Sequence, residues 1–302
     1  MQEIKNLQSI GKAIQLKQKQ GNGFRKMYRK ELTLDKIKYS TKKTPEKHTV
    51  RVRNVRIGEG NCVIIAGPCS LESEEQIFEI AKCVKKSGGD ILRAGCFKMR
   101  TSPYSFQGLG IEGIKILKEV GKEIGIPVST EIVRTEHLDL FDDIDLIQVG
   151  ARNMQNYELL KELSRIDKPI LLKRGAGSTL EELLFAAEYL MMNGKEDIIL
   201  CERGIKTFET GTRNTLDISA VPLLHESSCL PVAVDPSHAS GIKSLVRDLS
   251  LASVACGSDA LLIETHNCPE KALSDSEQQI SLKEFRKLAG EIKKLSKFIK
   301  EM

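Results

Sequence analysis

The sequence has no apolar run that approaches the roughly 18 residues needed to cross a membrane, which argues against a membrane partner. No apolar signal region follows the N-terminus, and an acidic residue as early as Glu3 argues against a transit peptide. The eight cysteines include no Cys-x-x-Cys pair, so they do not read as a disulfide framework. They are expected to be small core residues in a reducing compartment, which predicts a cytoplasmic protein.

The net charge of +5 arises from one end of the chain. Residues 1–60 carry 16 Lys and Arg against 5 Asp and Glu, whereas the remainder carries 30 against 36. The main body therefore shows no basic excess that would indicate a nucleic-acid partner. Residues 1–48 are polar and short of aromatics, and we expect a solvated basic arm with a possible helix at 4–19. Docking of this arm against a partner subunit is the alternative.

Residues 49–302 alternate between short apolar runs and amphipathic segments of helical length. Val and Ile alternate with Arg over 49–57, which predicts a strand with one wet face, as in a hairpin that closes the bottom of a barrel. Eight strands are then predicted at 62–66, 90–93, 127–131, 146–149, 169–173, 198–201, 231–234 and 260–264. Eight helices are predicted at 74–87, 111–124, 135–141, 155–164, 179–193, 215–225, 244–256 and 282–300. This strict alternation predicts an α/β fold, a (β/α)8 TIM barrel with an N-terminal hairpin extension.

A loop rich in cations and glycine, residues 93–110, follows the second predicted strand. Lys98, Arg100 and the pair Thr101-Ser102 are spaced so that the loop could turn them all onto one anion. The planar fork of arginine suits phosphate and carboxylate because it donates two parallel hydrogen bonds. Taken alone, such a loop is more often a solvated surface loop that carries incidental charge.

Cations gather at the carboxyl ends of the predicted strands, where the active site of a (β/α)8 barrel lies. They are Arg93, Lys98, Arg100, Arg152, Lys173, Arg174 and Arg203. Converging cations repel one another and are costly to desolvate, so together they indicate an anionic ligand with two phosphates, or with a phosphate and a carboxylate. For any single cation, a salt bridge to a neighbouring glutamate is the alternative.

Four potential metal ligands also lie at or after strand ends, namely Cys69, His238, Glu264 and Asp275. This mixed sulfur, nitrogen and oxygen set suits Fe, Mn, Zn or Co. Each residue comes from a different segment, so no local ligand spacing supports the assignment. A buried cysteine, a capped histidine and a solvated aspartate form the alternative reading, and His266 and Cys268 are nearby competitors.

Eight motifs occur in order along the chain: AGPCS (66–70), KMRTSPYSFQGLG (98–110), GARN (150–153), LLKRG (171–175), ILCERG (199–204), TRNTLD (212–217), DPSH (235–238) and EKALSD (270–275). Together they resemble the 3-deoxy-D-arabino-heptulosonate 7-phosphate (DAHP) synthase family in its short bacterial form. The resemblance implies a barrel enzyme that condenses phosphoenolpyruvate with D-erythrose 4-phosphate and releases phosphate, at the entry to the shikimate route to aromatic amino acids. A homodimer or homotetramer is expected by the same analogy.

The resemblance also implies roles for individual residues. The family's ligands for a divalent metal fall on Cys69, His238, Glu264 and Asp275. Its contacts to phosphoenolpyruvate fall on Arg93, Lys98, Arg152, Lys173 and Arg203, and its contacts to the aldose phosphate fall on Arg100, Thr101 and Ser102. Catalytic roles are implied for Lys98 and Lys173 as proton donors, for Glu131 near the reacting carbon, and for His238.

The chain departs from the family pattern in three places. Met99 stands where the family usually has proline, which loosens the loop. The Gly-Ala-Gly-Ser segment after Arg174 is more flexible than usual. Residues 1–48 match neither the regulatory domain nor the mutase domain that some relatives carry, so we expect no feedback inhibition by tyrosine or phenylalanine through an appended domain.

Three other functions compete with this assignment. The nearest is 3-deoxy-D-manno-octulosonate 8-phosphate synthase, which uses arabinose 5-phosphate and has an Asn-Arg-Ser-Ser pattern after the lysine. The Arg100-Thr101-Ser102 sequence favours the four-carbon sugar instead. A Schiff-base aldolase with Lys173 as nucleophile, and a phosphate- or RNA-binding barrel led by the basic arm, are the others.

Overall fold

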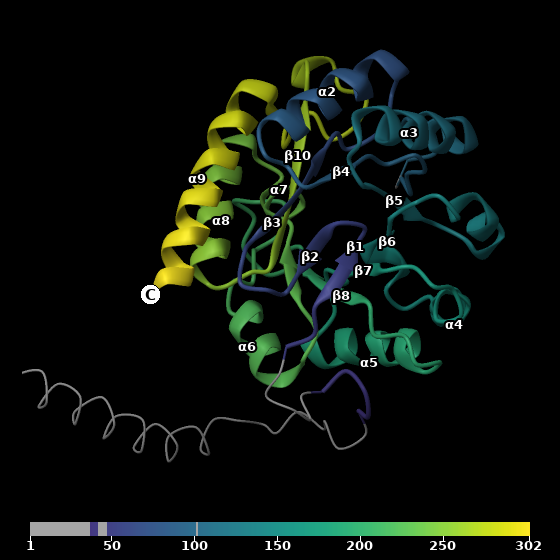
Figure 1. Ribbon diagram of the computed structural model, residues 1–302, viewed down its shortest axis with the longest axis vertical. Helices are drawn as coiled ribbons and strands as arrows, with labels where there is room; N and C mark the ends of the chain where they lie inside the picture. Colours follow the sequence, from purple (N-terminus) through teal and green to yellow (C-terminus); the bar gives the residue numbers. More distant parts are fainter. Residues whose placement is uncertain (1–36, 42–46, 101) are drawn as a thin grey trace, which may run out of the picture. The chain divides into compact units, whose positions relative to one another are not determined.

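The computed structural model describes residues 37–41, 47–100 and 102–302, which belong to one compact unit, Ile37–Met302 (Figure 1). The core of this unit is a closed barrel of eight parallel strands in sequence order. They are β3 (Val63–Gly67), β4 (Ile91–Arg93), β5 (Val128–Ile132), β6 (Leu146–Val149), β7 (Ile170–Lys173), β8 (Ile198–Glu202), β9 (Val232–Val234) and β10 (Ala260–His266). The barrel closes because β10 pairs with β9 and with β3, with Ala260 opposite Val63. The predicted (β/α)8 fold is confirmed.

Helices pack around the outside of the barrel (Figure 1). They are α2 (Glu74–Lys86), α3 (Gly110–Ile124), α4 (Tyr157–Leu163), α5 (Leu180–Met191), α6 (Ala220–Ser227), α8 (Lys243–Ala255) and α9 (Leu282–Glu301). Capping boxes start α5 at Thr179 with Glu182 and α9 at Ser281 with Glu284, which satisfies backbone donors that each first turn leaves free. No helix of the described ranges is both long and apolar enough to cross a membrane.

Two of the predicted helices differ in the structure, and several short elements were not predicted. Residues 135–141 form a 3₁₀ helix, η2 (Thr135–Phe141), rather than an α-helix. The helix expected at 215–225 begins only at Ala220, because 203–219 form a long loop tied by a bridge between Ile205 and Thr215. A short helix, α7 (Pro236–Ser240), follows β9, and a short strand, β11 (Ile280–Ser281), pairs beside the end of β10. Two further single turns are η3 (Ala151–Asn153) and η4 (Pro269–Lys271).

The predicted hairpin closes the amino-terminal end of the barrel. Strands β1 (Val50–Val52) and β2 (Val55–Ile57) pair antiparallel. Val50, Val52 and Ile57 are fully buried and pack in one cluster with the strand residues Val63, Ile65, Ile91, Leu146, Leu171, Ile199, Cys201, Ala233, Ala260 and Leu262. The arginines between them face outward, so the alternation in the sequence places apolar side chains against the barrel core. This leaves the carboxyl-terminal end of the barrel as the open one.

Little of the expected basic arm lies within the described residues, and the helix expected at 4–19 lies outside them. Residues 37–41 lie against α5. The backbone N–H groups of Lys38, Tyr39 and Ser40 donate to the Glu188 carboxylate at 2.9, 2.8 and 2.5 Å. Burial opposes ionisation of Glu188, but these donors hold its pKa below the ordinary value. Residues 37–41 are thus anchored to the barrel, and the division of the chain at residue 48 stays a prediction.

A buried carboxylate ties β9 and α6 to the segment before β1. Asp259 accepts hydrogen bonds from the Val232 backbone at 2.8 Å, from His225 Nε2 at 2.9 Å and from Lys47 Nζ at 2.5 Å. Burial opposes ionisation of Asp259, but His225 and Lys47 hold its pKa below the ordinary value. Its ionised form therefore stabilises the fold.

Replacing Asp259 by asparagine is expected to lower the free energy of unfolding by about 2–4 kcal/mol, because Lys47 loses its ion-pair partner and only one acceptor oxygen remains for three donors. Urea unfolding at pH 7 measures this change. Since the folded pKa of Asp259 lies below the unfolded value of about 3.9, the contribution is complete above that value and is lost as the pH falls through the folded pKa. The difference between wild type and variant should therefore shrink in acid. Asp248→Asn, in an exposed pair with Arg247, is the control, and equal stability of Asp259→Asn and wild type would contradict the assignment.

Candidate active site and metal centre

A cavity of about 570 Å³ opens at the carboxyl ends of the barrel strands. It is lined by Lys98, Met99, Arg100, Ser102, Ser105, Glu131, Gly150, Ala151, Arg152, Lys173, Ala176, Arg203, Lys206, Arg213, Asn214, His238 and Asp275. Seven of these side chains are lysine or arginine and two are carboxylates, so the cavity carries an excess of positive charge. Such a lining suits a ligand with several anionic groups.

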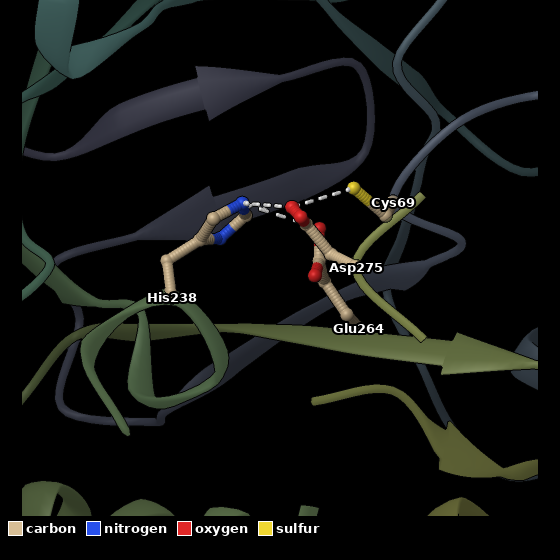
Figure 2. A group of neighbouring side chains, drawn as sticks. All are labelled: Cys69, His238, Glu264 and Asp275. Carbon is tan, nitrogen blue, oxygen red and sulfur yellow. Dashed lines mark hydrogen bonds and ion pairs between the residues drawn. The ribbon is translucent and has the colours of Figure 1, made fainter. Parts of the chain in front are cut away.

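Four potential ligand side chains meet beside this cavity (Figure 2). Cys69 follows β3, His238 lies on α7, Glu264 lies on β10, and Asp275 lies in the loop between β10 and β11. One ligand atom from each lies within 4.8 Å of the others. Cys69 Sγ is 3.2 Å from Asp275 Oδ2, and His238 Nε2 is 3.4 Å from Glu264 Oε1. The structure therefore brings together the four residues that the sequence proposed as metal ligands.

Asp235 orients the histidine of this cluster. It caps α7 by accepting the His238 backbone N–H at 2.9 Å, and Pro236 occupies the first helical turn, where its lack of an N–H leaves no donor unpaired. The second carboxylate oxygen of Asp235 accepts from His238 Nδ1 at 2.7 Å. This bond places the ring proton on Nδ1 and leaves Nε2 as a lone pair directed at the cluster, as in metal-binding histidines.

The electrostatics of the cluster fit a divalent cation. Burial, reinforced by Glu264, raises the pKa of the Cys69 thiol to about 12, so a thiolate forms there only when a cation replaces the proton. Burial would raise the pKa of Asp275 too, but the neighbouring Lys98 ammonium holds it well below its usual range. Burial lowers the pKa of His238, so its imidazole is neutral at neutral pH. One sulfur, one nitrogen and two carboxylates thus form a donor set that suits a first-row divalent metal.

Two deep cations adjoin the cluster. Arg93 ends β4, and its Nη1 donates to Glu264 Oε1 at 2.5 Å, while its Nε is buried without a hydrogen-bond partner among the described residues. An unsatisfied buried donor is costly, so this nitrogen fits an anionic ligand group. Lys173 ends β7, and its Nζ donates to Asp235 Oδ2 at 2.5 Å. Lys173 thus lines the cavity, whereas Arg93 lies behind its lining, against Glu264 of the ligand cluster, and each cation is held by a buried carboxylate.

Comparison with known proteins identifies the family to which this site belongs. Residues 35–301 match the DAHP synthetase I family. The chain belongs to this family. The phospho-2-dehydro-3-deoxyheptonate aldolase of Thermotoga maritima is 48% identical over 253 residues, which cover 83% of this chain and 75% of the relative. The 2-dehydro-3-deoxyphosphooctonate aldolase of Geobacter sulfurreducens is 30% identical over 272 residues, which cover 83% and 98%.

Solved structures agree with this membership. A crystal structure of the Thermotoga maritima phospho-2-dehydro-3-deoxyheptonate aldolase (DAHP synthase) superposes with a TM-score of 0.84 at 46% identity, over 88% of this chain and 78% of that chain. A truncated form of the 3-deoxy-D-arabino-heptulosonate 7-phosphate synthase from the same organism gives 0.81 at 42% identity, over 86% and 97%. The resemblance drawn from the motifs is confirmed, and the chain is an enzyme of the DAHP synthase type.

Glu131 projects from β5 into the cavity of this family member. Gln148 Nε2 donates to Glu131 Oε2 at 3.0 Å from the neighbouring strand β6. A Cβ atom at Gly150 would lie 2.1 Å from Glu131 Oε1, so only glycine leaves room for the carboxylate in this position. Gln148 thus holds one carboxylate oxygen of Glu131, and the lack of a side chain at Gly150 leaves space for the other.

Most of the other residues expected in the site line the cavity. Lys98, Arg100, Ser102, Arg152 and Arg203 line the cavity. Burial opposes the charge on Lys98, yet Cys69 and Glu264 raise its pKa above the ordinary value, so it stays an ammonium. Arg152 Nη1 donates to the Met99 carbonyl at 3.0 Å and so supports the loop at the position where the family usually has proline. Thr101 lies outside the described residues.

Arg174 does not share the site, contrary to the expectation that all strand-end cations converge. Its Nη1 donates to Glu202 at 2.9 Å and to Asp217 at 2.8 Å, and it does not line the cavity. Neighbouring residues of an extended chain point to opposite sides, so Lys173 faces inward, whereas Arg174 points to Glu202 at the end of β8 and to Asp217 in the following loop. His266, a possible competitor for the metal, instead accepts the Cys268 backbone N–H at 2.9 Å and lies 2.8 Å from Gln76 Nε2.

The cavity also contains residues that the reading of strand ends missed. Lys206, Arg213 and Asn214 come from the loop between β8 and α6. Arg213 and Asn214 lie within the TRNTLD motif, but they are far from the end of β8 in the sequence. For Arg213 and Asn214, the TRNTLD motif was therefore the only signal in the sequence, and it did not indicate what either residue does.

Proposed function

We propose that this chain condenses phosphoenolpyruvate with D-erythrose 4-phosphate and water to give DAHP and phosphate, the first step of the shikimate pathway. One observation carries this proposal: a Cys-His-Glu-Asp cluster borders a cavity whose cations lie both deep and at the rim. Such a cavity suits two anionic substrates that meet beside a Lewis acid. The membership of the DAHP synthetase I family supports the same reaction.

Phosphoenolpyruvate is assigned to the deep part of the cavity. Its phosphate and carboxylate are expected to contact Arg93, Lys98, Arg152, Lys173 and Arg203. Arg93 and Lys173 are each 4% exposed, so their charges act in a region from which water is largely excluded. The unpartnered Arg93 Nε offers a donor to one anionic oxygen. The aldose phosphate is assigned to Arg100 and Ser102, which line the cavity, and to Thr101, which lies outside the described residues.

Cys69, His238, Glu264 and Asp275 are proposed to hold the divalent ion, with Mn, Fe, Zn or Co all compatible with the donor set. When bound, such an ion supplies Lewis acidity where negative charge develops on the aldehyde oxygen of the aldose. Asp235 keeps His238 Nε2 available for this role through its bond to Nδ1. His238 is thus both a ligand and part of the catalytic machinery.

The proton transfers are assigned to three side chains. Carbon–carbon bond formation joins C3 of phosphoenolpyruvate to the aldehyde carbon, and the aldehyde oxygen takes a proton from Lys98 or Lys173. Water then adds at C2, and phosphate leaves from the resulting hemiketal. Glu131, held on one oxygen by Gln148, is placed to orient that water and accept its proton.

The test is phosphate release from phosphoenolpyruvate in the presence of a panel of aldose phosphates. Erythrose 4-phosphate should give the highest kcat/KM, and arabinose 5-phosphate should give little product, as the Arg100-Thr101-Ser102 sequence predicts. The 48% identity to a phospho-2-dehydro-3-deoxyheptonate aldolase, against 30% to a phosphooctonate aldolase, supports the same choice. A preference for arabinose 5-phosphate would overturn it.

Assembly and location are proposed by analogy and from composition. A homodimer or homotetramer is the proposed state, with residues 1–48 as a basic arm before the barrel. All eight cysteines are free thiols, which fits a reducing compartment, and we infer that the enzyme acts in the cytoplasm.

A further inference from the structure

Arg213, in the loop between β8 and α6, is a cavity cation to which the roles above assign no task. Its guanidinium lies 3.7 Å from Asp275 Oδ2. Arg100, from the loop between β4 and α3, lies 3.6 Å from the other oxygen of the same carboxylate, Oδ1. Two loops that are distant in the sequence therefore place their arginines on either side of Asp275.

The cations in and behind the cavity lining differ in burial. The Arg93 and Lys173 side chains are each 5% exposed and are paired with buried carboxylates. The Arg100 side chain is 21% exposed and the Arg213 side chain is 41% exposed. Arg213 therefore belongs with Arg100 at the rim rather than with the deep pair. A substrate whose reacting carbon lies at the floor would direct a distal phosphate to this rim.

Gln278 determines where Arg213 points. This glutamine is 2% exposed and lies in the loop between β10 and β11. Its amide oxygen accepts from Arg213 Nη1 at 3.0 Å, and its amide nitrogen donates to Glu264 Oε2. A carboxylate can only accept and a guanidinium can only donate, so both neighbours require the same orientation of the amide.

The same glutamine connects Arg213 at the rim to the buried carboxylate of Glu264. Glu264 Oε1 accepts from Arg93, and Glu264 Oε2 accepts from Gln278. A chain of hydrogen bonds thus runs from Arg213 through Gln278 and Glu264 to Arg93. Because Gln278 is buried and both of its polar ends are engaged, it has little freedom to release Arg213 into solvent.

We propose that Arg213 is a further substrate-binding residue that holds the distal phosphate of the aldose together with Arg100, and that Gln278 is its positioning residue. The inference rests on the proposed condensation and extends it to a second wall of the aldose site. Two planar guanidinium groups from opposite loops can each donate two hydrogen bonds to one phosphate. Asp275 holds both groups near the position that this phosphate would take.

Steady-state kinetics on the full chain, with each substrate varied in turn, test the role of Arg213. Arg213→Met should raise the KM for erythrose 4-phosphate by about tenfold to a hundredfold, because a charge-assisted contact is lost. The KM for phosphoenolpyruvate should change by less than about twofold, and Arg213→Lys should recover part of the loss. Arg247→Met is the matched control, since Arg247 also pairs with two carboxylates but lies on α8 outside the cavity.

A double-mutant cycle tests Gln278. Gln278→Met keeps the side-chain length and removes both hydrogen bonds, and it should raise the KM for erythrose 4-phosphate by less than Arg213→Met does. Combining the two changes should give no more than the Arg213→Met effect, because Gln278 acts through Arg213. Thermal unfolding and metal content are measured for each variant, so that a loss of fold or of metal is separated from a change in substrate binding.

The outcomes separate this inference from the function on which it rests. A wild-type enzyme that makes no product from phosphoenolpyruvate and erythrose 4-phosphate refutes the proposed function itself. An active wild type with an unchanged aldose KM in Arg213→Met overturns the role of Arg213 alone. A rise confined to the phosphoenolpyruvate KM also overturns it, because Arg213 would then serve the deep site. Fully additive effects in the double variant overturn the positioning role of Gln278.

Discussion

Excess chelator is expected to abolish condensation, with a loss of about a thousandfold or more, and added Mn²⁺ should restore it. The reason is the convergence of Cys69, His238, Glu264 and Asp275 within 4.8 Å beside the cavity. Without a cation, these groups are a buried thiol, a neutral imidazole and two carboxylates, and none of them can stabilise a developing alkoxide. Phosphate release from phosphoenolpyruvate measures the rate, and metal analysis of the same samples measures occupancy.

A matched pair of cysteine variants separates metal loss from a general effect of the chelator. Cys69→Ser should lower both the bound metal and the rate, because serine is a poor ligand for these metals. Cys256→Ser should change neither, since Cys256 is exposed at the end of α8. Full activity in excess chelator, or unchanged metal content in Cys69→Ser, would contradict the metal role.

Replacing Lys173 by methionine is expected to lower kcat by about a hundredfold to ten-thousandfold. Lys173 is the cation at the end of β7, it is buried, and its ammonium pairs with Asp235 at 2.5 Å. The variant removes both a proposed proton donor and a contact to phosphoenolpyruvate, so the KM for that substrate should rise as well. Lys173→Arg should recover binding more than kcat, because arginine keeps the charge but does not release a proton.

Lys195→Met provides the control for this prediction. Lys195 is also partly buried, but its ammonium donates to the Lys168 carbonyl outside the cavity, so kcat should be unchanged. A kcat within twofold of wild type for Lys173→Met would exclude Lys173 as a required proton donor. Borohydride treatment with substrate addresses the Schiff-base alternative, since covalent trapping at Lys173 would support a different reaction.

The barrel was predictable because its strands are short apolar runs that the barrel buries on both sides. Every residue of β3, β6, β7 and β8 is buried, as continuous apolar segments require. The connections were less predictable. The helix was expected to begin at residue 215, yet residues 215–219 continue a loop that is held by bonds such as Thr215 N–H to the Ile205 carbonyl and Lys206 N–H to the Ala176 carbonyl. Sequence periodicity reports local burial and cannot report such distant partners.

The site was predictable to the extent that its residues lie directly at strand ends. Cys69, His238 and Glu264 could be brought together because parallel strands of a barrel all end at one face. Arg174 was wrongly grouped with its neighbour Lys173, since one residue along the chain reverses the direction of a side chain. Arg213 and Gln278 were missed because they lie in long loops, where distance along the sequence carries little information about position.

By itself, the sequence determined the barrel, the family and the four members of the Cys-His-Glu-Asp cluster, because apolar periodicity and ordered motifs act over a few neighbouring positions. Only the tertiary structure decided which cations face the cavity, which lie deep and which lie at the rim. It also decided that Gln278 joins Arg213 to Glu264. Such contacts depend on the paths of loops, which long-range hydrogen bonds set and which no local pattern encodes.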